Sequence, residues 1–426
     1  MTDIRSPERS VDVYRWLLVG ALTLVMTGFY GAYLSFGVLL KPILLEFGWT
    51  RTTVSGAMSL SSGITGLSGV ISGRLTDRYG AKLLIGIGAI LGISGYLFMT
   101  RMNSVWQLYI YFGIIVGISF SVCWTPVTAT VSRFFFKNRV LALGITTSGI
   151  TVGQMFLPPL LTFFINSNGW RFAYIISAII IFLSAVPAVI ILGKNYWEPG
   201  NIGPQYKKRT NTKNENAAES GRQYTWKVLE AVQTLPFWIL LLTGFVTAAG
   251  FFFIAVHIVA YATDMGIEAN RAAVIFTFMG GANILGKFLT PLIVIKIGSK
   301  KTLAFLLALQ ALALFVLIGA DGLWMFFLLI TIFGFGFGGS SPLRMTMIAE
   351  FFGLKSIGAM IGTIEIAWSL GAISGPVMAG FVFDVSGRYD TAFLTGGLIV
   401  LIGSVSACFL KKPLEKGENF NHTPEG

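Results

Sequence analysis

Residues 73–82, GRLTDRYGAK, separate two apolar segments and have a partial copy in the second half of the chain. The copy, residues 291–300, reads PLIVIKIGSK and preserves one glycine and two basic positions, whereas an isoleucine replaces Asp77. A second related pair is found at residues 133–135 (RFF) and 350–352 (EFF). Repeats on this scale indicate duplication of an ancestral unit, so we expect two pseudo-symmetric halves.

The composition places most of the chain in a lipid bilayer. Of the 426 residues, 54% are hydrophobic and 12% are charged, and the mean hydropathy is +0.74. A soluble domain carries about 25% charged residues. These values exclude an ordinary soluble enzyme, a disordered protein and a nucleic-acid-binding protein. The net charge of +12 then indicates basic loops at an anionic membrane face.

Twelve apolar segments are long enough to cross a membrane as helices, which need about 20 residues each. They are residues 16–40, 54–73, 82–100, 105–132, 140–165, 171–193, 236–262, 271–295, 301–319, 323–349, 357–383 and 391–410. With the N-terminus inside, 23 of the 31 Lys and Arg residues fall in inner segments and six in outer ones. The sequence therefore predicts an all-α integral membrane protein with twelve transmembrane helices and both termini cytoplasmic.

A polar stretch divides the twelve segments six to six. It begins at residue 194 and includes the run NTKNEN at 211–216, which cannot bury enough apolar surface to fold alone. We expect an N-terminal half at 1–193, a cytoplasmic linker at 194–235 and a C-terminal half with a short tail at 236–426. The two cysteines and two histidines are scattered, so the sequence predicts no metal site and no cofactor.

With this organisation, residues 73–82 resemble the loop signature of the major facilitator superfamily of transporters. Four further stretches are similar to its branch of monocarboxylate transporters and oxalate–formate antiporters: FGWTR at 47–51, GWRFA at 169–173, HIVAYATDMG at 257–266 and DVSGRY at 384–389. The resemblance covers almost the whole chain. It implies a transporter rather than an enzyme and alternating access around a site near the bilayer midplane. It also implies that glycines recurring in the second, fifth and eleventh segments line the seams between the halves. Separately, we expect a functional monomer.

The signature loop suggests a conformational latch. Gly73 and Gly80 are expected to let the backbone turn tightly, and Asp77 and Arg78 place opposite charges at the predicted cytoplasmic end. The resemblance implies that Asp77 holds a helix N-terminus or an arginine while the cavity faces outward, and Arg133 and Arg139 are the candidate partners in this half. Alternatively, the basic residues of this loop serve only as topology signals.

Three charged residues fall inside predicted spans, where a charge costs about 2.5–3.5 kcal/mol on insertion scales. Lys287, Arg344 and Glu365 are predicted at comparable depths and leave one net positive charge, which favours a small anionic substrate. Asn283 precedes Lys287 by four residues and therefore shares its helix face. The monocarboxylate branch has an acid or amide at this spacing before an Arg that holds the substrate carboxylate. The resemblance thus implies that Asn283 and Lys287 bind substrate, with Lys in place of Arg.

Two residues are candidates for proton coupling. Protonation of Glu365 would free Lys287 to bind substrate, although the two could instead form a structural ion pair. His257, near the outer end of its helix, could serve as an outer gate or proton-entry group, or could simply be hydrogen-bonded there. Arg344 could bind substrate, or it could extend its aliphatic stem to the inner interface.

Tyr30 and Tyr33, three residues apart, could donate to a carboxylate or could act as packing aromatics. We therefore predict a secondary active transporter of small organic anions in the cell membrane, with monocarboxylates such as lactate or pyruvate favoured and proton symport as the mechanism. The alternatives are an anion exchanger for dicarboxylates or formate- and oxalate-like acids, and an efflux carrier for another small organic solute. The expected partners are the anionic substrate, protons or a counter-anion, and the lipid bilayer.

Overall fold

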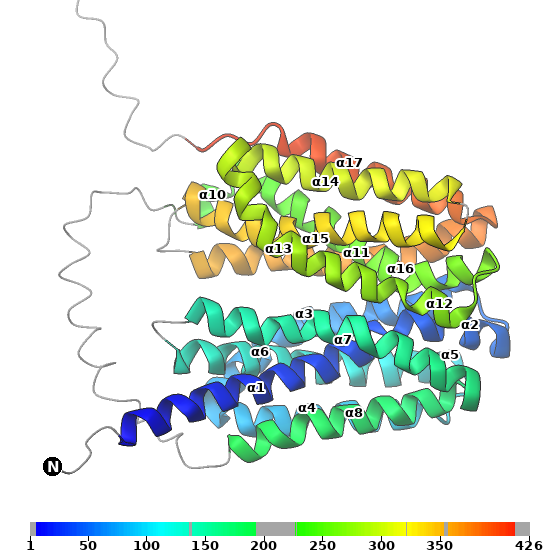
Figure 1. Ribbon diagram of the computed structural model, residues 1–426, viewed down its shortest axis with the longest axis horizontal. Coiled ribbons are helices and arrows are strands. Elements are labelled where there is room, and N and C mark those ends of the chain that lie inside the picture. The colour runs from blue at the N-terminus through cyan, green and yellow to red at the C-terminus, as the bar shows by residue number, and fades with distance from the viewer. Residues whose placement is uncertain are drawn as a thin grey trace, which may run out of the picture.

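The computed structural model describes residues 6–135, 139–192, 226, 228–320, 322–352 and 357–413, and every regular element among them is helical. The side chains of Asp77, Arg133 and Glu365, and most of the predicted linker, lie outside this description. The helices form two bundles that lie side by side along their length (Figure 1). The predicted all-α architecture is therefore confirmed.

The first bundle, the N bundle, is the lower one in Figure 1. Its elements are α1 (Ser6–Leu34), α2 (Phe36–Phe47), α3 (Arg51–Tyr79), α4 (Ala81–Met99), α5 (Val105–Leu108), the π-helix η1 (Tyr109–Val116), α6 (Gly117–Phe134), α7 (Arg139–Asn168) and α8 (Trp170–Ile191).

The second bundle, the C bundle, is the upper one in Figure 1. It consists of α10 (Val228–Ala231), α11 (Leu235–Asp264), α12 (Ala269–Ala273), α13 (Ile275–Ile297), α14 (Ser299–Val316), the 3₁₀ turn η2 (Leu317–Gly319), α15 (Leu323–Phe352), α16 (Ile357–Ser386) and α17 (Tyr389–Ala407).

Eleven helical segments in the described chain are long and apolar enough to cross a membrane, and α1 with α2 counts as one of them. The 29-residue α3 is not among the eleven, because its sequence is rich in Gly, Ser and Thr. It nevertheless packs against α6 in its own bundle and against α16 in the other. Small residues permit such close helix contacts at the expense of hydropathy.

The two ends of the molecule differ. We call the end where α1 begins and α17 ends the terminal end; it lies at the left of Figure 1. The opposite, distal end carries the connections from α2 to α3, from α11 to α12 and from α16 to α17 (Figure 1). The distal part of the first span is a separate helix, α2, because the helix is interrupted at Ser35. The Ser35 hydroxyl donates to the carbonyl of Gly31 at 2.6 Å.

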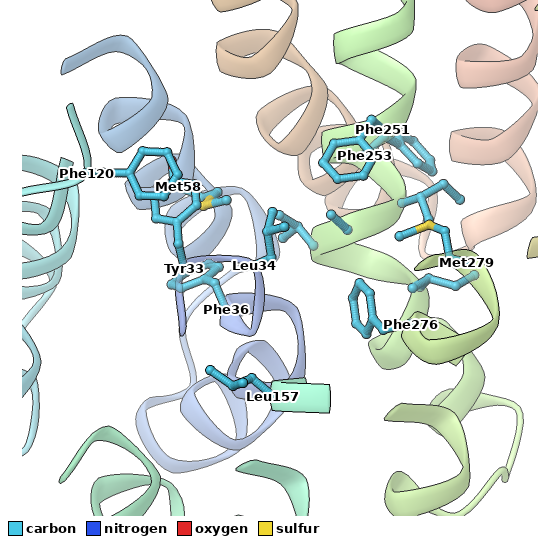
Figure 2. Packing of buried hydrophobic residues seen from close by; sticks show 14 of the residues in the cluster. Tyr33, Leu34, Phe36, Met58, Phe120, Leu157, Phe251, Phe253, Phe276 and Met279 are labelled. Carbon is cyan, nitrogen blue, oxygen red and sulfur yellow. The ribbon is translucent and has the colours of Figure 1, made fainter. Parts of the chain in front are cut away.

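Close glycine contacts join the bundles at the distal end and at mid-depth. A Cβ on Gly37 of α2 would lie 2.1 Å from the carbonyl oxygen of Ala255 in α11, and a Cβ on Gly66 of α3 would lie 2.8 Å from Ser369 Oγ in α16. Apolar side chains are buried at this contact as well. Figure 2 shows Phe36 on the N-bundle side and Phe276 on the C-bundle side.

Other glycines do not lie where the sequence predicted. Gly149 and Gly153 approach α1 within the N bundle, and Gly371 and Gly375 approach α11 within the C bundle. The expectation that these four line the seam between halves is therefore wrong. Glycine periodicity indicates that a helix has a close neighbour, but it does not identify that neighbour.

Candidate functional site

Lys287 and Asn283 lie on the protein-facing side of α13. The opposite side of this helix is exposed, with Phe288 at 75% exposure and Leu285 and Leu292 above half. At 100° per residue, Asn283 and Lys287 point away from that exposed strip. Asn283 is buried, and among the described residues its Oδ1 has no hydrogen-bond partner.

The surroundings of Lys287 open toward the terminal end. Two turns nearer the distal end, Gly280 touches Thr151 and Met155 of α7, where its Cβ would lie 2.2 Å from Met155 Cγ. Gly144 occupies the same face of α7 as Thr151, two turns closer to the terminal end, and a Cβ there would meet no atom within 4 Å. The seam between α7 and α13 thus separates at the level of Lys287. Lys287 is exposed, and it makes no hydrogen bond or ion pair to any residue that the structure describes.

Arg344 of α15 is held inside the C bundle. Its side chain is 1% exposed, and Nη1 donates to the Thr243 carbonyl and to Thr247 Oγ1, both at 3.4 Å. Its guanidinium carbon lies 5.6 Å from the ring centre of Trp368 in α16. The alternative in which Arg344 extends to the inner interface is wrong, because these contacts with α11 and α16 keep the guanidinium in the core.

The packing register places Arg344 near Lys287 in depth. On α13, Met279 and Asn283 contact Gly334 and Gly338 of α15, respectively. The two helices run in the same direction, so continuing this register by one turn brings Lys287 level with residue 342. Arg344 is then about 3 Å further along the axis at 1.5 Å per residue. Both cations therefore lie in one layer of the C bundle.

The tyrosines lie in the N bundle. Tyr30 packs against Phe120 and Trp124, with ring centres 4.0 and 5.6 Å away. Tyr33 is buried against Phe120, as Figure 2 shows, and its hydroxyl hydrogen-bonds Ser62 Oγ at 3.1 Å. Aromatic packing is thus the visible role of both rings in this conformation.

A cluster of charged and aromatic groups joins the bundles at the distal end. Arg51, at the start of α3, inserts between Asp264, Phe383 and Tyr389 of the C bundle, which we call the Arg51 socket. The guanidinium carbon is 3.8 Å from the ring centre of Phe383 and 4.6 Å from that of Tyr389. Arg51 pairs with the Asp264 carboxylate and donates to the Tyr389 hydroxyl oxygen.

Further contacts close the same end. Lys41 Nζ of α2 lies 2.8 Å from Asp264 Oδ1. The Asp384 carboxylate accepts the backbone N–H groups of Arg51 at 3.1 Å and Thr52 at 2.8 Å, and so caps the first turn of α3.

His257 lies directly behind the socket and is fully buried. Nε2 is 3.0 Å from the Pro376 carbonyl oxygen, and Nδ1 is 3.1 Å from the Tyr389 hydroxyl. A carbonyl oxygen can only accept, so Nε2 carries a proton. An unbroken series of hydrogen bonds therefore connects Asp264, Arg51, Tyr389 and His257.

Side-chain links between the bundles are concentrated at the distal end. Besides the contacts above, Asn166 donates to Asn270 at 3.1 Å, and Thr277 in the first turn of α13 donates to the Met155 carbonyl at 2.6 Å. At the terminal end, no hydrogen bond or ion pair between two residues that the structure describes joins one bundle to the other. The bundles are thus joined at the distal end, and the described part of the seam between α7 and α13 is open at the level of Lys287.

The predicted latch is described only in part. Gly80 joins α3 to α4 with φ of 84°, which explains a glycine there. Gly73 lies inside α3, so the expectation of a turn at this residue is wrong. Arg78 is exposed, and its guanidinium lies 5.3 Å from the ring centre of Tyr79. Because the side chains of Asp77 and Arg133 lie outside the described residues, the latch stays a prediction.

In the sequence, the stretches at 47–51 and 384–389 were only marks of resemblance, and the stretch at 257–266 also contained the proton-coupling candidate His257. The structure brings all three together around the Arg51 socket. The stretch at 169–173 braces α2 instead, because Trp170 Nε1 and Arg171 Nη1 donate to Glu46 at 2.6 and 2.8 Å. Opposite charges in predicted outer loops were the signal that could have indicated the socket.

The family model described as Major Facilitator Superfamily matches residues 19–317 and 240–426. The chain belongs to this superfamily. It is 24% identical over 395 residues to monocarboxylate transporter 13 of Rattus norvegicus, covering 91% of this chain and 87% of the relative. It is 22% identical over 405 residues to monocarboxylate transporter 2 of Homo sapiens, covering 92% and 84%.

Two solved structures of a bacterial homologue of the human lysosomal transporter Spinster share the fold. The inward-facing occupied form has a TM-score of 0.71 at 15% identity and covers 92% of this chain and 96% of that one. The inward-facing unoccupied form has a TM-score of 0.69 at 17% identity and covers 92% and 95%. This member of the superfamily is a multi-pass membrane transporter similar to monocarboxylate transporters, and not an enzyme.

Proposed function

We propose that this superfamily member crosses the cell membrane twelve times, with α3 as the twelfth span, and that both termini are cytoplasmic. The inner location of most Lys and Arg residues supports this orientation. The terminal end would then face the cytoplasm, and the conformation would be inward-open. The halves would comprise residues 1–193 and 236–426, joined by a cytoplasmic linker at 194–235.

We infer that the transporter carries small carboxylates by alternating access. The observation that carries this proposal is Lys287, a cation inside a candidate span that points toward the separated seam and has no partner among the described residues. The carboxylate of the substrate would bind its ammonium group. Arg344 would add positive potential from the same layer, and Asn283 Oδ1 would accept a hydrogen bond from the substrate.

The named relatives favour monocarboxylates such as lactate or pyruvate. Tyr30 and Tyr33 would form the aromatic wall on the side of the N bundle. A lysine holds a carboxylate as a compact point charge rather than as a bidentate fork, so selectivity would rest on the shape and polarity of this pocket.

Proton symport is the proposed coupling, with Glu365 and His257 as the titrating groups. Glu365 belongs to α16, one turn before the Trp368 ring that covers Arg344. Protonation of this carboxylate would increase the positive charge available to the substrate. The second candidate is anion exchange, because Lys287 and Arg344 at one depth could together hold two anionic groups.

Uptake into liposomes by the purified protein tests the proposal. Radiolabelled lactate, pyruvate, formate, acetate and oxalate would be supplied with and without an inward proton gradient. We expect gradient-driven uptake of a monocarboxylate that Lys287→Ala abolishes and Lys287→Arg retains in part. Lys301→Ala, at an exposed lysine of α14, is the matched control and should transport normally.

The other outcomes separate the alternatives. Uptake that requires acid preloaded inside the liposomes would establish exchange in place of symport. Uptake that is unchanged in Lys287→Ala would refute the proposed anion site. Failure to take up any of the five acids, by protein that retains its fold, would refute the proposed substrate class.

A further inference from the structure

His257 and the Arg51 socket form one hydrogen-bonded unit that spans the two bundles. Arg51 is the only member of this series from the N bundle; Asp264, Tyr389 and His257 belong to α11 and α17 of the C bundle. Withdrawal of Arg51 is therefore a necessary part of opening the distal end. Any event at His257 that disfavours the seated Arg51 will favour the open state.

The donors and acceptors around His257 show what its protonation would do. With Nε2–H donated to the Pro376 carbonyl, a neutral His257 has only a lone pair at Nδ1, which accepts the Tyr389 O–H. The Tyr389 oxygen in turn accepts from Arg51. The Tyr389 hydroxyl proton and the imidazole proton are thus each donated once, and the closed socket matches a neutral imidazole.

A proton added at Nδ1 reverses the direction of one bond. Nδ1–H must then donate to the Tyr389 oxygen, where Arg51 already donates, and the Tyr389 proton loses its acceptor. The imidazolium and the guanidinium also face each other across a single hydroxyl group, and like charges in a buried site repel strongly. Protonation of His257 and seating of Arg51 therefore oppose each other.

The other charged groups nearby do not remove this conflict. Asp264 of α11 is shared between Arg51 and Lys41 of α2, and Asp384 of α16 is engaged with the backbone at the start of α3. Within the part of the chain that the structure describes, no carboxylate forms a hydrogen bond or ion pair with His257 itself.

We propose that a proton bound at His257 expels Arg51 from its socket and so opens the distal end, which makes Tyr389 and Arg51 the positioning residues of an outer proton switch. The only bond that forms is N–H at Nδ1, with a proton from the distal solution, and it breaks when the socket closes again. This inference rests on the proposed proton-coupled transport and supplies the step in which the transporter opens at its distal end.

Labelling of a buried thiol tests the switch without any substrate. Ser59 lies on α3 between Ser55, which faces Gly380 of α16, and Gly63, which faces Ile373. It is buried, and its hydroxyl has no hydrogen-bond partner among the described residues. Ser59→Cys is therefore a seam thiol that an impermeant maleimide reaches only when the distal end opens.

A reference thiol corrects for intrinsic reactivity and orientation. Asn103→Cys is exposed on a distal loop, so the ratio of seam to loop labelling reports the open fraction at each pH. Both variants carry Cys408→Ser, because Cys408 is exposed, whereas the buried Cys123 is retained. Uncorrected rates would rise with pH simply because the thiolate is the nucleophile.

We expect the ratio to rise as the pH falls, by up to about tenfold per pH unit, the limit for a single proton. His257→Gln should make the ratio independent of pH. Tyr389→Phe keeps the aromatic contact with Arg51 but removes the hydroxyl, so it should weaken the response, and it provides the test if His257→Gln does not fold. Glu268→Gln, which alters a distal carboxylate outside the series, should leave the response unchanged.

A flat ratio in the protein with His257 intact would overturn the inference, as would a full pH response in His257→Gln. The latter would assign the effect to Asp264 or Asp384. Gradient-driven carboxylate uptake with a flat ratio would refute this switch alone. A pH-dependent ratio without carboxylate uptake would refute the proposed substrate and leave the switch standing.

Discussion

Replacing Gly37 by alanine should force the two bundles apart at the distal end. The new Cβ would lie 2.1 Å from the carbonyl oxygen of Ala255, and neither atom can rotate away, because the Cβ is fixed to the α2 backbone and the oxygen belongs to the α11 backbone. A carbon and a carbonyl oxygen approach to about 3.3 Å at closest. The bundles must therefore separate by about 1 Å here, or α2 must shift along α11.

The size of the effect follows from this overlap. An added methyl group in a well-packed contact costs about 1–3 kcal/mol. The distal-closed state carries this cost, whereas a state in which α2 leaves α11 does not. A free energy of this size shifts a two-state equilibrium by roughly 5- to 150-fold toward the open form.

The ratio of seam-thiol to loop-thiol labelling measures the shift. Gly37→Ala should raise this ratio at neutral pH and slow net uptake, because the closed state is needed in every cycle. Gly20→Ala is the matched control: Gly20 is a glycine of α1 with no atom within 4 Å of its Cβ position. An unchanged ratio in Gly37→Ala, with melting behaviour like that of Gly20→Ala, would refute the claim that this contact closes the distal end.

Three further predictions concern charged groups. Glu46→Gln removes the ion pair with Arg171, whose two side chains are 38% and 43% exposed. The free energy of unfolding, measured by thermal denaturation, should therefore change by no more than about 1 kcal/mol, and uptake should persist. A larger loss of stability would contradict a minor role for this ion pair. Arg344→Lys should reduce carboxylate uptake by more than about tenfold, because lysine lacks the planar guanidinium that faces Trp368 and whose Nη1 donates to the Thr243 carbonyl and Thr247 Oγ1. Wild-type uptake would count against the site. Asp77→Asn should lower seam-thiol labelling, because it weakens the latch of the outward-open state; labelling equal to that of the parent would remove the latch from the mechanism.

The membrane architecture could be predicted because its signals are local. Hydropathy over about 20 residues marks a span, whichever helices surround it. The repeated loop at 73–82 and 291–300 likewise indicated two halves and the superfamily without any knowledge of packing. Only α3 departs from this rule, since its small polar residues suit close packing better than contact with lipid.

The candidate site could be predicted only in part. Lys287 and Arg344 were identified because charges are costly within a span, and that cost does not depend on partners. Whether each charge points to lipid, to a seam or into its own bundle depends on how helices rotate against one another. Arg344 proved to be buried against Thr243, and the glycines at 149 and 153 proved to face α1 rather than the other half.

The sequence alone determined that this chain is a helical membrane transporter with charged residues inside its spans. Apolar length, loop charge and duplicated motifs are local features of the sequence and do not depend on how the helices pack. Only the tertiary structure decided what closes the distal end. Arg51 meets Asp264 from 213 positions away and Tyr389 from 338 positions away. Such pairs form only when the two bundles dock, and no periodicity within either bundle encodes the distance between them.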